Sequence, residues 1–166
     1  MSVKKILIIF VLVTFSLNAS AVTPRSTGKY KNWESFVVET DKGKICFAQT
    51  APTKRAPAAI KRDKSKLFVT FRPSEEIKDE VSLTSGHDYK TSSVTVSSGK
   101  RRYSFFSQKD FAWLLDDQEE KKFIQLMKKA TDIIVKARTA KGAETTDHYS
   151  MMGFTKAYNT AKKTCS

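Results

Sequence analysis

The chain has few of the residues from which metal sites and nucleophilic active sites are built. It is 166 residues long and contains only two cysteines and two histidines, and these four residues do not stand at the spacing of a zinc site. A nucleophile elbow and a glycine-rich phosphate loop are absent too. The sequence therefore predicts no bound metal and no cofactor, and it favours a protein that is not an enzyme.

Long hydrophobic runs are also lacking, with one exception near the N-terminus. Residues 6–15 are almost all apolar; Lys4 and Lys5 precede them, and an Ala-x-Ala motif occupies residues 19–21. This order is typical of a secretory signal peptide, and the run is shorter than the ~20 residues that a membrane-spanning helix needs. We expect residues 1–21 to be removed. The mature chain is then periplasmic or secreted, without a transmembrane segment.

Negative charge is scarce. The 17 acidic residues stand against 30 lysines and arginines, which gives a net charge of +13 for the whole chain and +11 once the two signal lysines are removed. Such an excess attracts anionic surfaces. For an exported bacterial protein these are anionic lipids, lipopolysaccharide or an acidic partner protein. Nucleic acid is a less favoured partner, because export separates the protein from it and no nucleic-acid-binding motif is visible.

The two cysteines, Cys46 and Cys165, are an even number with none left over. An oxidising compartment permits disulfides, so export favours one structural bridge between them over a pair of free thiols. The two positions are 119 residues apart. On the chain-entropy model, such a bridge stabilises the folded state by at most about 5 kcal/mol.

The pattern of apolar residues predicts a mainly β fold. Residues 22–31 are polar and indicate a flexible lead-in, and residues 32–166 suffice for a single domain. Two segments repeat apolar residues as amphipathic helices do: one begins near Asp116, and the other follows Gly153 with Cys165 on its apolar face. Short alternating strands with two short helices, the last at the C-terminus, favour a β-sandwich. Strands are predicted over residues 33–39, 44–50, 67–72, 80–85, 93–97, 101–107, 133–138 and 149–152.

Two basic segments are candidate binding sites, the first for an anionic surface and the second for an anionic glycan or lipid head group. The first is the proline-containing loop over residues 51–66, which holds one acid, Asp63, against six basic residues. The second places three basic residues beside aromatic ones in a predicted hairpin. Long loops with one sign of charge often carry function, but a solvated loop and a hairpin with one buried face explain these patterns as well. The candidate residues are Lys54, Arg55, Lys61, Arg62, Lys64, Lys66, Lys100, Arg101 and Arg102.

Each of the two histidines has an aspartate beside it, in the pairs His87-Asp88 and Asp147-His148. Adjacent residues of a strand point to opposite faces, so the spacing alone does not make either pair a base and its orienting carboxylate. Ser150 shares a face with His148, because the two are separated by two positions. A periplasmic hydrolase that uses His148 is therefore the alternative function.

Three large aromatic residues, Trp33, Phe111 and Trp113, are candidates for a ligand platform. Large aromatic side chains of a sandwich more often belong to its core, so both interpretations stay open. The alternation places Trp33 and Phe36 on opposite sides of the strand predicted over residues 33–39.

Several short motifs follow one another along nearly all of the mature chain. They are Trp33, the Gly-Lys-Ile-Cys-Phe-Ala of residues 43–48, Arg72-Pro73, Ala112-Trp113, and the Asp-His-Tyr-Ser-Met-Met-Gly-Phe of residues 147–154 with Cys165 behind it. In this order they resemble the invasion-associated locus B family, and the closing motif is the most specific. The resemblance implies a small exported protein of a Gram-negative alphaproteobacterium with an immunoglobulin-like β-sandwich. The founding members of the family are linked to entry into host cells. Some members carry a further cysteine soon after the first tryptophan, and its lack here leaves one possible bridge.

These patterns predict an exported, non-catalytic protein that acts by binding, either in the bacterial envelope or in contact with a host. The expected partner is an anionic lipid, lipopolysaccharide or an acidic protein. The basic residues named above are the expected contacts.

Overall fold

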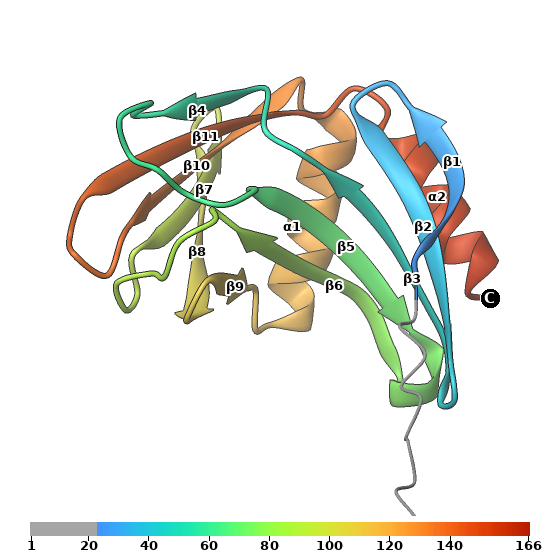
Figure 1. Ribbon diagram of the computed structural model, residues 1–166. Helices are drawn as coiled ribbons and strands as arrows, with labels where there is room; N and C mark the ends of the chain where they lie inside the picture. The colour runs from blue at the N-terminus through green and yellow to red at the C-terminus, as the bar shows by residue number, and fades with distance from the viewer. Residues whose placement is uncertain (1–22) are drawn as a thin grey trace, which may run out of the picture.

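The computed structural model describes residues 23–166, so the expected signal peptide lies outside the described residues. These residues form one antiparallel sheet of eleven strands with two α-helices (Figure 1). A mainly β fold with two helices, the last at the C-terminus, is thereby confirmed. The elements are β1 (Arg25–Tyr30), β2 (Trp33–Thr40), β3 (Gly43–Thr50), β4 (Lys54–Ala56), β5 (Lys66–Arg72), a 3-10 turn (Pro73–Glu75), β6 (Ile77–Thr84), β7 (Val94–Ser98), β8 (Arg101–Gln108), β9 (Phe111–Trp113), α1 (Asp117–Lys129), β10 (Asp132–Arg138), β11 (Glu144–Ser150) and α2 (Phe154–Thr164).

The order of strands in the sheet is β1-β2-β3-β5-β6-β9-β8-β7-β10-β11-β4. β8 pairs with β9 near its end and with β7 along most of its length. It therefore joins two halves of the sheet. The first half is formed by β1, β2, β3, β5, β6 and β9, and the second by β8, β7, β10, β11 and β4. The two halves also meet directly, because the indole N–H of Trp33 on β2 donates to the carbonyl oxygen of Ser150 on β11 at 2.9 Å.

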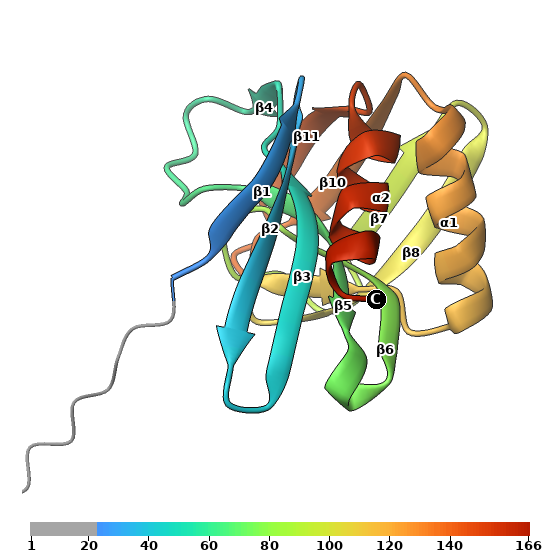
Figure 2. The same ribbon diagram turned by 90° about the vertical axis from the view of Figure 1, so that its right-hand side faces the viewer.

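The two helices cover one face of the sheet (Figure 2), and the side chains between this face and the helices form the hydrophobic core. The ring of Phe154 on α2 lies 4.8 Å from that of Trp33, measured between centroids. Phe123 on α1 lies 4.9 Å from Tyr103 of β8. The apolar stripe of each helix therefore faces inward, as the sequence predicts. Asp116 caps α1, since its carboxylate accepts a hydrogen bond from the backbone N–H of Glu119 at 2.8 Å.

The predicted disulfide is confirmed. Cys46 of β3 and Cys165, at the end of α2, are joined by an S–S bond of 2.09 Å, and their Cα atoms lie 5.8 Å apart. The bond fixes the last helix to the first half of the sheet. A disulfide fits an oxidising compartment outside the cytoplasm. Neither helix among residues 23–166 combines the length and the apolar character needed to cross a membrane.

The flexible lead-in predicted over residues 22–31 is wrong for Arg25–Tyr30, which form the edge strand β1. This strand is polar, and it is held in place by pairing with β2 and by side-chain hydrogen bonds. The hydroxyl of Ser26 donates to Glu34 at 2.7 Å, and the hydroxyl of Tyr30 lies 2.9 Å from that of Thr160 on α2. The three-residue strands β4 and β9 were also not expected, because three residues are too few to show a period.

Candidate anion-binding face

The outer face of the second half of the sheet is rich in basic and hydroxyl side chains. On β10 and β11, buried residues alternate with more exposed ones, and the exposed set points away from the core. The same alternation orders β7 and β8. We call the basic and hydroxyl-bearing members of this outward-facing set the basic face; they are Lys54, Thr95, Ser97, Arg102, Lys136, Arg138, Thr146 and His148. Asp132, Ile134 and Glu144 point outward on the same strands.

Strand register places these residues side by side. One row of successive Cα partners crosses all five strands and consists of Lys54, His148, Ile134, Ser97 and Arg102. Lys136 stands in the next row, between Thr146 and Thr95. Neighbouring strands lie about 4.8 Å apart, so Lys54 and Arg102 are separated by roughly 19 Å. The row therefore brings one residue from each of the two predicted basic segments onto a single face.

A hollow of about 540 Å³ lies on this face over β7, β10 and β11. The hydroxyls of Thr95, Ser97 and Thr146 line it together with Arg102 and Lys136. Arg138 also reaches the hollow, but its guanidinium is paired with Glu144 at 2.7 Å. Guanidinium, ammonium and hydroxyl donors together suit phosphate or carboxylate groups, because charge-assisted hydrogen bonds to these anions are strong. The hollow is therefore a candidate site for an anionic ligand.

The other predicted basic residues do not gather on this face. Lys61 and Lys64 are exposed in the loop between β4 and β5. Arg55 is half-buried, and its Nη2 donates to the carbonyl oxygen of Asp63 at 2.5 Å. Lys66 belongs to the first half of the sheet, where its ammonium donates to the Gln49 side chain at 2.9 Å. The exposed Lys100 and Arg101 lie at the β7–β8 turn, beside the face.

Arg62 is not an anion-binding surface residue, contrary to the prediction. Its side chain is 2% exposed and that of Asp147 is 1% exposed. Two guanidinium nitrogens donate to the two carboxylate oxygens of Asp147 at 2.8 and 2.5 Å, and further bonds reach the carbonyl oxygens of Ser85 and Ala56. Its donors are thus used inside the protein. The pair fastens the long basic loop to β11.

The histidines do not form a catalytic arrangement with the neighbouring aspartates. Asp147 points inward to Arg62, so it does not orient the outward-facing His148. The hydroxyl of Ser150 accepts a hydrogen bond from the backbone N–H of Met152 at 3.2 Å. The imidazole of His87 contacts the carbonyl oxygen of Asp88 and the hydroxyl of Thr145, each at 3.0 Å. Neither described histidine is therefore oriented by the carboxylate of the aspartate that neighbours it in the sequence.

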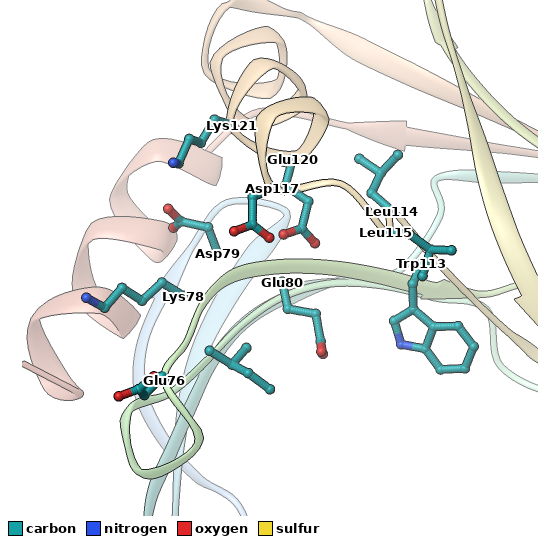
Figure 3. A pocket seen from close by; sticks show the side chains of 11 residues that line it. Glu76, Lys78, Asp79, Glu80, Trp113, Leu114, Leu115, Asp117, Glu120 and Lys121 are labelled. Atoms are coloured by element: carbon teal, nitrogen blue, oxygen red, sulfur yellow. The ribbon is translucent and has the colours of Figure 1, made fainter.

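A second hollow, of about 570 Å³, lies between β6 and α1 and is acidic (Figure 3). Asp79, Asp117 and Glu120 gather there, and Asp79 accepts a hydrogen bond from the hydroxyl of Tyr158 at 2.6 Å. Burial raises the pKa of Glu120 to about 7, although the backbone N–H of Val81, which donates to it at 2.8 Å, acts in the opposite direction. Among residues 23–166 no group of three or more acidic, histidine or cysteine residues is arranged to hold a metal ion.

Comparisons of the chain with models of protein families, with curated proteins and with solved structures find no match. The basic face is therefore interpreted through its own geometry and chemistry.

Proposed function

We propose that this protein is an exported, non-catalytic binding protein that recognises an anionic component of the bacterial envelope through the basic face. The observation that carries the proposal is the row of register partners that unites Lys54 with Arg102, with Lys136 beside it. Phosphate groups of lipopolysaccharide or of phospholipid head groups have the charge that these donors would bind. An acidic partner protein is the other ligand that such a face would suit.

Two further observations support export and the family. The disulfide fits an oxidising envelope compartment. The order of motifs from Trp33 to Cys165 resembles the invasion-associated locus B family, which is exported. The immunoglobulin-like β-sandwich that this resemblance implies belongs to the same proposal. The described residues form one continuous antiparallel sheet. Contact with a host cell is a further role that the family resemblance suggests.

The test is binding to lipopolysaccharide and to anionic lipid vesicles over a range of salt concentrations. Affinity should fall as salt screens the charges. Lys136→Glu and Arg102→Glu should each weaken binding by about 2 kcal/mol, or roughly thirtyfold, because one basic residue near an anionic surface contributes about 1 kcal/mol and reversal doubles the change. Lys163→Glu is the matched control, because Lys163 is an exposed residue of α2. Equal weakening by the control, or affinity that does not respond to salt, would contradict the proposal.

A further inference from the structure

The outer face of the first half of the sheet carries a continuous row of aromatic side chains. Phe36 and Phe47 are Cα partners with ring centroids 5.3 Å apart. The ring contacts continue from Phe47 to Phe68 at 6.1 Å, from Phe68 to Phe111 at 6.4 Å, and from Phe111 to Trp113 at 5.9 Å. All five side chains are half-buried and lie on the side of the sheet opposite the core. We call these five residues the aromatic row.

A hollow of about 410 Å³ opens between the rings. It exists because β6 contributes the small residue Ser82, which is the Cα partner of both Phe68 and Trp113. The charged residues at its edge, Arg72 and Glu80, neutralise each other in a salt bridge of 2.7 Å. The helices lie on the opposite face of the sheet (Figure 2), so neither of them covers these rings.

The aromatic row is distinct from the core aromatic residues. Trp33, which the sequence groups with Phe111 and Trp113, is fully buried on the inner face. The five rings are only partly open to solvent, but they are contiguous with the 49% exposed Phe106 and have polar residues at their edge. A contiguous apolar surface with polar edges is the usual mark of an interaction surface. The core therefore does not account for the aromatic row.

The aromatic row adjoins the basic face. Phe106 of β8 is 49% exposed and is the Cα partner of Trp113. Arg102 lies on the same strand and also points outward, since residues of a strand separated by an even number of positions share a face. One continuous outer surface thus carries aromatic rings on the first half of the sheet and basic side chains on the second.

We propose that the aromatic row inserts into the surface of an anionic phospholipid bilayer while the basic face contacts the lipid head groups. This inference rests on the proposed recognition of an anionic envelope component and names the bilayer as that component. Aromatic side chains favour the boundary between head groups and acyl chains, and clustered basic residues add attraction to anionic lipids. A second copy of the chain is the poorer occupant, because it would bring a further charge of +11 against the first.

The test uses the two tryptophans of the full mature chain. Vesicles of phosphatidylglycerol and brominated phosphatidylcholine should quench the emission of the wild-type protein, because bromine quenches an indole that enters the bilayer surface. Trp113→Phe should abolish this quenching, since the remaining Trp33 is fully buried. Unquenched wild-type protein on vesicles to which it binds would overturn the proposal.

Matched variants test the row without relying on fluorescence. Phe106 and Met152 are both 49% exposed, but only Phe106 adjoins the aromatic row. Phe106→Ser and Phe47→Ser should each weaken vesicle binding by at least tenfold, whereas Met152→Ser should not change it. Retention of wild-type affinity by both phenylalanine variants, or loss in the methionine control, would overturn the proposal.

A soluble polyanion such as polyphosphate separates this inference from the proposed function. Salt-sensitive binding of polyphosphate that is unchanged in Phe47→Ser supports the division of roles between row and basic face. If the protein binds polyphosphate but the bilayer does not quench Trp113, the membrane inference fails and the proposed function stands. If it binds neither polyphosphate nor anionic vesicles, both fail. A dimer that Phe47→Ser converts to a monomer in sedimentation would make a second copy the occupant and overturn the inference.

Discussion

Replacement of Glu120 by glutamine should stabilise the protein at neutral and alkaline pH. Glu120 is only 7% exposed and lies on α1 beside β6. Burial is the main reason why its pKa is raised to about 7, and the neighbouring acids Glu80, Asp117 and Asp79 add to it. Glutamine has nearly the same shape, and its side-chain oxygen can still accept the hydrogen bond that the Val81 N–H donates at 2.8 Å. The variant therefore removes a buried charge and leaves the contact in place.

The magnitude follows from the change in pKa. A rise from the ordinary value of 4.5 to about 7 corresponds to about 3 kcal/mol. Because the folded protein holds the proton more tightly than the unfolded chain, the stability from this group is full below pH 4.5 and is lost as the pH rises to about 7. Glu120→Gln should thus be more stable than the wild type by up to about 3 kcal/mol near pH 8 and nearly equal to it near pH 4.

Urea unfolding with the disulfide intact, followed by tryptophan fluorescence at a series of pH values, measures this difference. The wild type should lose stability between about pH 4.5 and pH 7 relative to Glu120→Gln. Glu76→Gln is the matched control, because Glu76 lines the same hollow but is exposed. The reasoning is refuted if Glu120→Gln loses stability with rising pH as the wild type does. It is also refuted if Glu76→Gln abolishes this loss of stability as fully as Glu120→Gln does.

Two further changes test the interior. Arg62→Ala should destabilise the fold by about 3–5 kcal/mol, because Asp147 then stays buried without its partner; urea unfolding checks this against exposed Lys61→Ala, and equal losses would contradict it. Mass spectrometry of the native protein should find Cys46 and Cys165 joined, two hydrogens lighter than the reduced form. Reduction should lower the free energy of unfolding by at most about 5 kcal/mol. Recovery of both cysteines as alkylatable thiols would contradict the bridge.

The elements that the sequence predicts well are those with one buried face. In β2, Trp33, Ser35 and Val37 are buried and the intervening residues are more exposed, so the period of two is visible along the chain. α1 and α2 show the helical period for the same reason, since Phe123 and Phe154 both face the core. Burial on one side leaves a pattern that needs no knowledge of distant contacts.

The elements and sites that the sequence does not reveal depend on distant partners. β1 has mainly exposed or half-buried residues and becomes a strand by pairing with β2. Arg62 resembles its exposed basic neighbours, and its burial depends on Asp147, 85 residues further on. In β2 the alternation of residues separates Trp33 from Phe36. Both sides of β2 carry apolar residues, so the alternation alone does not tell which side faces outward. The aromatic row is visible only when strands from several parts of the chain are assembled.

The disulfide also determines what a cut in the main chain would do. It closes a covalent ring from Cys46 to Cys165, and β1 and β2 lie outside this ring. Exposed loop tips are the preferred sites of proteolytic nicking, and the loop between β4 and β5, which contains the exposed Lys61 and Lys64, lies within the ring. A protease that cleaves once in this loop would leave both pieces covalently joined in one molecule, and two separate bands would appear on a denaturing gel only after reduction.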